Sequence, residues 1–304
     1  MKKIHAVTVA LLGRGRNRLM TTPLTISAPI LQLNASLDDC HGDVDLPRKQ
    51  LRRSFDPAFQ FMSDLHLEHG HRYADFTISP CAPYLILAGD IGQLWHESEY
   101  LSFLRRHCDM FQRVFLIPGN HEFYGISRPE GLRVLDQMQQ ELDGRLFVMN
   151  RTRCNIDGTI LLGCTLHSHI PSEVEGLTND FQRITNWHVS DHNREHCLDR
   201  AWLEQTLEDI HATLLLSRVI IATHYAPSYE NTAHPRHESS KYKHCFCSDT
   251  LSEISANQAV PQLETWVFGH THYNAYFYFG KTLVVSNQVD DRLCARKFDL
   301  EATI

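Results

Sequence analysis

The stretch VFLIPGNHEFYG, residues 114–125, is the part of the sequence from which the fold of this chain can be inferred. Its first four residues are apolar and predict a buried strand. A Pro-Gly pair then ends the strand, and an amide, an imidazole and a carboxylate follow at once as Asn120, His121 and Glu122. Loops at strand ends often carry polar side chains, so a plain polar turn is the simplest interpretation. The rest of the chain decides whether these three side chains do chemistry.

The composition is that of an ordinary globular protein, with 42% hydrophobic and 21% charged residues in 304 positions. A chain of this length forms one large α/β domain or two small ones. No apolar run approaches the roughly 20 residues that a membrane span needs, so we expect no membrane association. Nine cysteines without a CxxC pair favour free thiols in a reducing compartment, which predicts a cytoplasmic protein.

The first 54 residues differ from the remainder in charge. They hold nine Lys/Arg and four Asp, a net charge of +5, and residues 1–37 contain no acid. Such a segment resembles a mitochondrial transit peptide, although its helical amphipathicity is poor. We favour the interpretation that residues 1–54 are a disordered leader or follow from a misassigned start. Subtracting +5 from the total of −7 leaves −12 on residues 55–304. A domain this acidic is not expected to bind nucleic acid.

Apolar runs of strand length alternate with helical patterns after residue 55. Apolar residues recur at helical spacing from Leu132 to Leu142 and again from Leu203 to Leu214. This alternation predicts an α/β layered fold with mixed sheets. The connection 227–247 shows no periodicity, which is typical of a functional lid or of disorder. The five main strand candidates are Phe59–Met62, Tyr84–Ala88, Val114–Ile117, Val219–Ala222 and Trp266–Phe268, and the shorter ones are Thr159–Leu166, Tyr276–Phe279 and Thr282–Val285.

A carboxylate, an imidazole or a carboxamide follows each of the five main strands. The carboxyl ends of strands in α/β sheets are where ligands bind. Each signal alone is weak, because the chain has 20 histidines and the pair His167 and His169 has no companions. The five signals together strongly indicate one site. They are Asp64 and His66 after FQFM, Asp90 after YLILA, Asn120 and His121 after VFLI, His224 after VIIAT, and His270 and His272 after WVF.

These residue types suit a pair of metal ions. Two ions about 3.5–4 Å apart can hold the attacking and leaving oxygens of a phosphoryl transfer, and a bridging carboxylate keeps such dications together. Nitrogen and oxygen donors favour Mn²⁺, Zn²⁺ or Fe, and a set without cysteine disfavours a structural zinc site. Alternate residues of an extended segment lie on one side, so both members of DxH or HxH reach one centre.

The blocks SDLH, GD, GNHE, H and GHTH resemble the calcineurin-like metallophosphoesterase superfamily, with all five present in the family order. The resemblance covers about residues 59–290 and makes 55–304 the catalytic domain. It is strongest to a branch of small fungal and bacterial phosphoesterases, through THYAPS at 223–228, NDFQRITNW at 179–187 and DHNREHCLDRAWL at 191–203. It implies a fold of two mixed β-sheets packed face to face with helices outside, a four-layer αββα arrangement.

The resemblance also implies a role for each residue of the site. Asp90 would bridge two divalent metals, and His121 would contact the phosphoryl group and assist the leaving oxygen without binding metal. Glu122 would brace the turn. The first metal would be held by Asp64, His66, Asp90 and His272, and the second by Asp90, Asn120, His224 and His270.

One departure separates this chain from the Ser/Thr protein phosphatases of the same superfamily. That branch has GDxVDRG, in which a further Asp supports the catalytic His, whereas this chain has GDIGQL with Gln93 at that position. The second His of GHTH, His272, is present here and absent there. We therefore do not expect a protein phosphatase of that branch.

Other polar residues are weaker candidates. Tyr124, directly after the catalytic block, and Arg183 are candidates for substrate contact, although a solvated arginine is the commoner case for Arg183. A second group sits at helical spacing before Trp202, and we favour a structural role at a helix N-terminus for it. The basic lid candidate admits an anionic substrate or is a mobile surface loop, and the two interpretations stand equal. The helical group is His192, His196 and Asp199, and the lid residues are His234, His237, Lys241, Tyr242 and Lys243.

The expected activity is hydrolysis of a small phosphate ester by a dinuclear metal centre, with attack by a metal-bridging hydroxide and no covalent enzyme intermediate. Two alternatives remain open at this stage. One is a phosphodiesterase that acts on a small diester or a cyclic nucleotide. The other is a non-catalytic interaction module that has kept the fold. The sequence does not determine the natural substrate, the metal or the oligomeric state.

Overall fold

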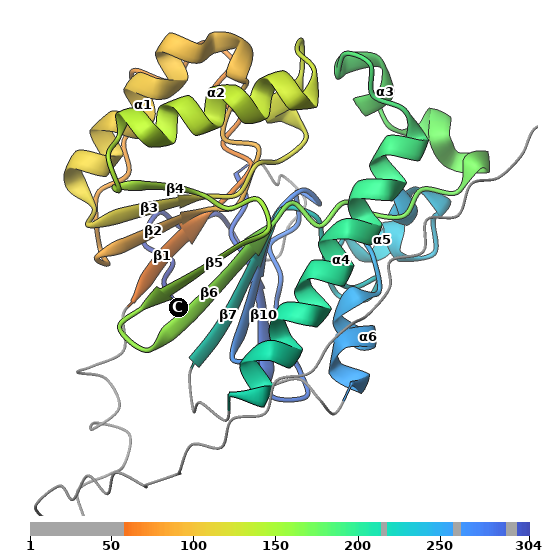
Figure 1. The fold of residues 1–304 in the computed structure, drawn as a ribbon. Helices are drawn as coiled ribbons and strands as arrows, with labels where there is room; N and C mark the ends of the chain where they lie inside the picture. Colours follow the sequence, from red (N-terminus) through yellow and green to blue (C-terminus); the bar gives the residue numbers. More distant parts are fainter. Residues whose placement is uncertain (1–57, 214–217, 258–262, 290–296) are drawn as a thin grey trace, which may run out of the picture. The chain divides into compact units, whose positions relative to one another are not determined.

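The computed structural model describes residues 58–213, 218–257, 263–289 and 297–304. The predicted leader over 1–54 lies outside these residues. Two β-sheets form the centre of the fold, and helices cover the outer face of each (Figure 1). This arrangement confirms the predicted α/β class with two packed sheets.

The first sheet has four strands in the order β1-β2-β3-β4, and all neighbouring strands run parallel. Parallel strands need crossover connections, and the helices that supply them cover the outer face of this sheet (Figure 1). Residues 302–304 add an antiparallel segment along β1 through bonds such as Ile304 N–H to Phe59 O, which makes this sheet mixed as well. The elements are β1 Phe59–Met62, β2 Tyr84–Leu87, α1 Glu97–Met110, β3 Arg113–Leu116, α2 Arg128–Glu141 and β4 Leu146–Val148.

The second sheet has six strands in the order β5-β6-β7-β8-β10-β9. The β5–β6 and β9–β10 pairs are antiparallel hairpins, and the central pairs are parallel. The helices α4 and α6 lie on its outer face (Figure 1). The strands are β5 Thr152–Ile156, β6 Thr159–Cys164, β7 Arg218–Thr223, β8 Thr265–Phe268, β9 Tyr276–Phe279 and β10 Thr282–Ser286; the helices are α3 Asp180–Arg183, α4 Val189–Ala212, α5 Pro235–Glu238 and α6 Thr250–Ala256.

The core has three apolar layers because the central strands are apolar on both faces. The middle layer, between the sheets, contains Phe61, Phe115, Leu161, Ile220 and Val267, all buried. The outer layers separate each sheet from its helices. Strands buried on both sides explain why runs such as VFLI and VIIAT do not alternate with polar residues. The packed sheets therefore fix where the carboxyl ends of β1, β2, β3, β7 and β8 lie.

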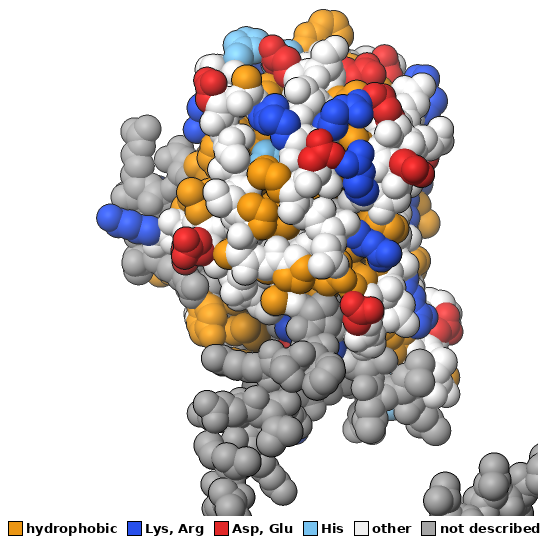
Figure 2. Space-filling view, turned by 90° about the vertical axis from the view of Figure 1, so that its left-hand side faces the viewer, with side chains coloured by type: hydrophobic (Ala, Val, Ile, Leu, Met, Phe, Trp, Pro, Cys, Tyr) orange, Lys and Arg blue, Asp and Glu red, His pale blue; other side chains and the backbone are white. Residues whose placement is uncertain are grey.

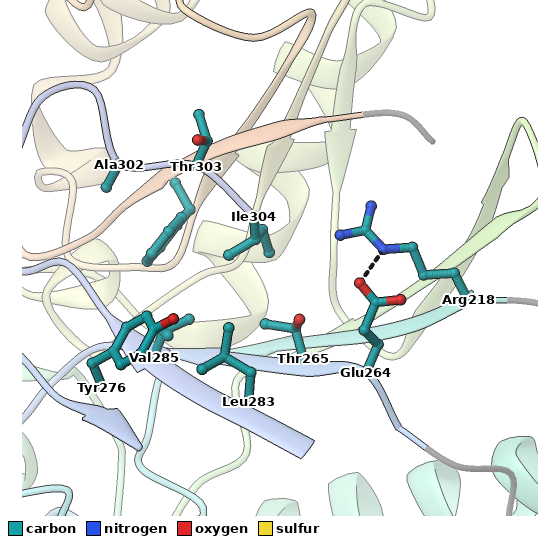
Figure 3. Close-up of a pocket in the computed structure, with 10 residues that line it drawn as sticks. Arg218, Glu264, Thr265, Tyr276, Leu283, Val285, Ala302, Thr303 and Ile304 are labelled. Atoms are coloured by element: carbon teal, nitrogen blue, oxygen red, sulfur yellow. Dashed lines mark hydrogen bonds and ion pairs between the residues drawn. The ribbon is translucent and has the colours of Figure 1, made fainter. Parts of the chain in front are cut away.

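A cavity of about 230 Å³ lies near the amino ends of β7, β8 and β10 (Figure 3). Its charged lining residues, Arg218 and Glu264, form an ion pair of 2.6 Å with each other, and Leu283, Val285 and Ile304 are apolar. The predicted metal ligands follow the opposite ends of these strands. This cavity therefore belongs to the packing of the C-terminal segment.

Most predicted strands are confirmed to within two residues at their ends, and the structure adds elements that the sequence patterns did not indicate. These additional elements are α1, β4, β5 and α6. The connection 227–247, whose lack of periodicity is typical of a functional lid or of disorder, contains α5 and a 3-10 turn at Lys241–Cys245. The helical pattern ending at Leu142 is α2, and Leu214 lies outside the described residues. The described cysteines are all free thiols. Among the described helices, none has the length and apolar character that crossing a membrane requires.

Candidate metal centre

Five loops meet at the carboxyl ends of β1, β2, β3, β7 and β8, and they bring together all the residues predicted to bind metal. Three of these loops come from the four-stranded sheet and two from the six-stranded sheet. Most of the predicted ligands are buried, with Asn120, His66 and His270 at 6–7% exposure, whereas the His272 side chain is 42% exposed. Charged and polar groups this deeply buried need partners.

One group of side chains contains Asp64, His66 and His272, whose ligand atoms lie within 4.8 Å of one another. His272 Nε2 is 3.7 Å from Asp64 Oδ1, and the rings of His66 and His272 stack with centroids 5.2 Å apart. His66 Nδ1 bonds to Glu68, while its buried Nε2 has no hydrogen-bond partner. A buried imidazole nitrogen without a partner, facing a carboxylate, is a suitable ligand for a cation.

The second group contains Asp90, His224 and His270 together with Asn120. His224 Nε2 lies 3.1 Å from Asn120 Oδ1, 3.1 Å from His270 Nδ1 and 3.3 Å from Asp90 Oδ1. The other ring nitrogen of each histidine donates to a backbone carbonyl, His224 Nδ1 to Ala88 at 2.9 Å and His270 Nε2 to Cys245 at 3.3 Å. With both rings neutral, His224 Nε2 and His270 Nδ1 would present lone pairs to each other, and a proton or a metal ion resolves that arrangement.

One histidine in each group has a raised pKa because carboxylates lie beside it, whereas burial and the charge of His224 hold the pKa of His270 well below its usual range. Burial opposes protonation of His224, but the negative charge of Asp90 and its hydrogen bond outweigh burial and raise the pKa of His224 to about 10. Burial likewise opposes protonation of His66, and the bond to Glu68 with the charges of Asp90 and Asp64 raises its pKa to about 9. The protein therefore provides an excess of negative charge that divalent metals would satisfy.

Asp90 lies between the two groups. Its Oδ1 faces His224 and accepts the His121 backbone N–H at 2.9 Å, while its Oδ2 is 4.0 Å from His66 Nε2. Burial would raise the pKa of Asp90, but the positive charges of His224, His121 and His66 hold it well below its usual range. An ionised carboxylate with one oxygen toward each group is placed to bridge two ions.

The loops hold this arrangement in strained backbone conformations. Positive φ is uncommon outside glycine and tends to occur at functional sites, where the surroundings compensate for the strain. Gly119 allows a close approach, because a Cβ there would lie 2.2 Å from Asp90 Oδ1 and 2.8 Å from His224 Nε2. The predicted ligands with positive φ are Asp64 (56°), His66 (44°), Asp90 (53°), His270 (70°) and His272 (50°).

Glu122 secures the loop that carries Asn120 and His121. Its buried carboxylate accepts the backbone N–H of Gly119 at 2.7 Å, of Asp90 at 2.9 Å and of Ile91 at 2.8 Å. Tyr100 on α1 donates a further bond at 3.0 Å. The geometry matches the bracing role predicted for Glu122, because one side chain joins the loops after β2 and β3.

Glu68 is a functional candidate that sequence analysis missed. Its Oε1 lies 3.1 Å from His121 Nδ1 and 3.2 Å from His66 Nδ1. Burial would raise the pKa of Glu68, but the bonds to His121 and His66 lower it to about 2. The run DLHLE, in which Asp64, His66 and Glu68 alternate, was the available signal. An anion beside His121 occupies the supporting role that Gln93 does not fill.

Asn120 is oriented by a second residue that the sequence did not indicate. Its amide nitrogen donates to Asp180 Oδ1 at 2.9 Å, which turns its carbonyl oxygen toward His224. Tyr124 donates to the same Asp180 oxygen at 2.7 Å, and Arg183 lies exposed with its guanidinium 5.2 Å from the Tyr124 ring centre. The structure thus places both predicted substrate contacts beside the site, and their contact with substrate remains a prediction.

The histidine-rich segment at 191–203 lies outside the metal centre, within α4. Asp199 accepts a hydrogen bond from His167 at 3.1 Å and forms an ion pair with Arg151 at 2.6 Å. His192 and His196 are buried close by. Burial lowers the pKa of both His192 and His196. These contacts fit a structural role, but His196 and Asp199 lie well inside α4 rather than at its N-terminus as predicted, because they belong to a buried polar network.

Comparison with known proteins gives consistent results. The family model described as calcineurin-like phosphoesterase matches residues 59–274. An uncharacterised protein, L509, from Acanthamoeba polyphaga mimivirus is 27% identical over 266 residues, which cover 76% of this chain and 90% of that protein. The [acyl-carrier-protein] phosphodiesterase PptH of Mycobacterium tuberculosis is 35% identical over 77 residues, 24% of this chain and 23% of that one. The crystal structure of the phosphopantetheinyl hydrolase PptH from the same organism superposes with a TM-score of 0.56 at 17% identity, covering 77% of this chain and 90% of that chain.

Proposed function

This chain belongs to the calcineurin-like phosphoesterase family, and from that premise we propose that it hydrolyses a phosphate ester at two divalent metal ions held by the five loops. The observation that carries the proposal is the position of Asp90, with one carboxylate oxygen toward each group of nitrogen and oxygen ligands. Metal-dependent hydrolysis of phosphoric esters is the chemistry of the family.

Two ligand sets follow from the geometry. The donors are carboxylate, imidazole and carboxamide, which suit Mn²⁺, Fe or Zn²⁺. When bound, the two ions would supply Lewis-acid charge to the phosphoryl oxygens and lower the pKa of a coordinated water to around 7. The first set is Asp64, His66, Asp90 and His272, and the second is Asp90, Asn120, His224 and His270.

His121 is the candidate acid for the departing oxygen. Its Nδ1 lies against Glu68, so Nε2 is the nitrogen available to substrate. Burial opposes protonation, but the charge of Asp90 and the bond to Glu68 raise the pKa of His121, which favours the imidazolium form. As the water oxygen bonds to phosphorus and the ester P–O bond breaks, His121 Nε2 would give its proton to the leaving oxygen, releasing an alcohol.

A phosphodiester is a second candidate substrate. The relative at 35% identity over 77 residues is an acyl-carrier-protein phosphodiesterase, and that short match supports a diester rather than a monoester for this chain. Hydrolysis of p-nitrophenyl phosphate and of bis(p-nitrophenyl) phosphate, each with Mn²⁺ and with chelator, tests both candidates. Faster diester cleavage would support a phosphodiesterase, and faster monoester cleavage would support a phosphatase. Absence of metal-dependent turnover on both would contradict the proposal.

Asp90→Ala tests the bridging role directly. We expect most of the bound metal and nearly all activity to be lost, because both sites share this carboxylate. Metal per chain is measured by atomic emission after gel filtration, with Asp136→Ala, an exposed acid on α2, as the matched control. Two metals retained per chain in Asp90→Ala would show that Asp90 does not bridge.

A further inference from the structure

A cavity of about 430 Å³ opens directly beside the candidate metal ligands. His270, Thr271 and His272 form one wall, and the segment 233–247 forms the other. The segment 233–247 belongs to the basic connection 227–247, for which a lid that admits an anionic substrate and a mobile surface loop were equal interpretations. A ligand in this cavity would border the metal centre on one side and the segment 233–247 on the other.

The segment 233–247 is held against the metal-binding loop by specific contacts. The Cys245 carbonyl accepts the His270 Nε2 proton at 3.3 Å, and the Phe246 ring lies with its centroid 5.0 Å from that of His270. Ala226 and Cys247 form a β-bridge that ties the end of the segment to the strand-end loop after β7. The wall is therefore built on the same residues that position a metal ligand.

The cavity combines an apolar wall with two cations. Ala233, Phe246 and Tyr242 contribute apolar surface, and Arg236 and Lys243 contribute positive charge. The Arg236 guanidinium donates from Nε to His237 Nε2 at 2.8 Å, and Lys243 Nζ lies 5.0 Å from the Tyr229 ring centre. No acidic side chain in the described part of the chain pairs with either cation. Cations without a protein carboxylate beside them are available to an anion of the ligand.

The size of the cavity exceeds what a phosphate group needs. Pockets of about 300–1,000 Å³ hold drug-sized organic ligands. We propose that this cavity binds the organic group of the ester substrate, and that Arg236 and Lys243 bind a second anionic group on it, remote from the scissile phosphate. The inference rests on the proposed phosphoesterase function and names the substrate class, a phosphoester with an apolar spacer and a second negative charge.

Matched synthetic substrates test this assignment. The probes are p-nitrophenyl phosphodiesters of alkyl alcohols of increasing length, each ending in a carboxylate or in the isosteric carboxamide. The leaving group and the scissile phosphate are then the same throughout, so a difference between members reports on the remote group alone. If the enzyme cleaves only monoesters, the phosphate monoesters of the same alcohols replace them.

We expect the carboxylate to lower KM about 10- to 100-fold relative to the carboxamide at one chain length, with kcat little changed, as one or two charge-assisted hydrogen bonds would produce. The double variant Arg236→Ala with Lys243→Ala should abolish this preference. The preference is the ratio of the KM values for carboxylate and carboxamide within each variant, so a change in overall turnover does not affect it. The matched control, Arg133→Ala with Lys281→Ala, removes an exposed arginine and lysine that do not line the cavity and should retain the preference.

The outcomes separate this inference from the proposed function. Equal KM values for carboxylate and carboxamide at every length, with turnover present, would overturn the cavity assignment and leave the phosphoesterase function standing. A preference that survives in Arg236→Ala/Lys243→Ala would also overturn it, because another group would then bind the charge. Failure of every ester, including the simple aryl ones, would instead overturn the proposed function.

Discussion

Glu68 connects the two kinds of residue in the site, the metal ligands and the candidate acid. One oxygen, Oε1, lies within hydrogen-bond distance of Nδ1 of both His66 and His121. The bonds to Glu68 thereby orient both rings with Nδ1–H toward Glu68. Residues that orient metal ligands in this way matter nearly as much as the ligands, and their loss costs about 10- to 100-fold in activity or affinity.

Substitutions of His121 and of Glu68 distinguish a role in catalysis or in orienting His121 from a role in metal binding. His121→Ala should keep both metals and lose about 10²–10⁴ in turnover, the usual contribution of an acid–base group. Glu68→Gln should also keep the metals and lose about 10- to 100-fold. Both losses should be larger for an alkyl ester than for a p-nitrophenyl ester, because a poor leaving group depends more on the proton. Turnover is measured on both ester types, with metal content determined in parallel.

The double variant shows whether the two residues act as a unit. If Glu68 acts through His121, His121→Ala with Glu68→Gln should be no slower than His121→Ala alone. Glu99→Gln is the matched control, because the Glu99 carboxylate pairs with His71 Nδ1 at 3.4 Å on the surface, as Glu68 pairs with His121 in the site. Additive losses would mean that Glu68 and His121 act independently, and loss of metal in His121→Ala would make His121 a ligand.

At the scale of elements, the loop after β3 depends on the absence of a side chain at Gly119. Gly119→Ala should lower metal affinity about tenfold or more while the fold persists, because the new Cβ would displace Asp90 and His224. Metal titration with circular dichroism as the folding check measures this. Gly176→Ala is the control, since a Cβ at that glycine meets no atom within 4 Å. Unchanged affinity in Gly119→Ala would show that the loop adjusts freely.

Helix α1 is joined to the connection between β1 and β2 through His107. The Ile78 backbone N–H donates to His107 Nε2 at 3.0 Å, and His107 Nδ1 donates to the Phe103 carbonyl at 2.8 Å. Burial lowers the pKa of His107, and the nearby Arg106 adds to this, although the bond to Phe103 opposes it. The buried ring therefore accepts a bond that only its neutral form can accept.

The pH dependence of stability follows from that lowered pKa. The folded pKa lies below the unfolded value of 6.5, so this contribution is complete above pH 6.5 and is lost as the pH falls. When the pH is lowered from about 7.5 to about 5.5, the free energy of unfolding should fall in both the wild type and His107→Gln. The fall should be larger in the wild type by up to about 1 kcal/mol. Urea unfolding of both proteins at each pH measures the difference. Equal losses would show that the pKa of His107 is the same in the folded and unfolded states.

Prediction from sequence succeeded for elements whose pattern is local. Strand β1 and the ligands Asp64 and His66 were predictable because a short apolar run ends in DLH. The edge strand β5, TRCNI, was not, because its outward residues are polar and exposed and give no apolar run. Asp180 was missed because its bond to Asn120 spans 60 residues, and no spacing in the chain encodes such a contact. The wall at 233–247 depends on tertiary contacts in the same way.

On the scale of the whole molecule, the charge distribution agrees with a small anionic substrate. Figure 2 shows basic and acidic side chains interspersed over one face, without the continuous basic area that binding to a polyanion needs. Arg236 and Lys243 instead line the 430 Å³ cavity that also reaches the proposed metal ligands His270 and His272. We therefore propose that attraction of an anion is a property of this cavity rather than of the face in Figure 2.

Removal of residues 1–54 should leave activity and metal content intact. The family match and strand β1 both begin at residue 59, and every proposed ligand lies beyond it. The truncated and full-length proteins are compared by turnover per bound metal and by thermal unfolding. A soluble, folded and inactive truncation would show that the leader contributes to the active enzyme.

The bond from the His270 backbone N–H to Asp64, at 3.1 Å, joins residues 206 positions apart. Contacts so distant in the chain form late, after the entropic cost of closing the intervening loops has been met. Metal uptake should therefore coincide with the final step of folding. Bound metal then stabilises the completed structure by mass action, so a cell that is short of metal would hold a less stable population of this enzyme as well as a less active one.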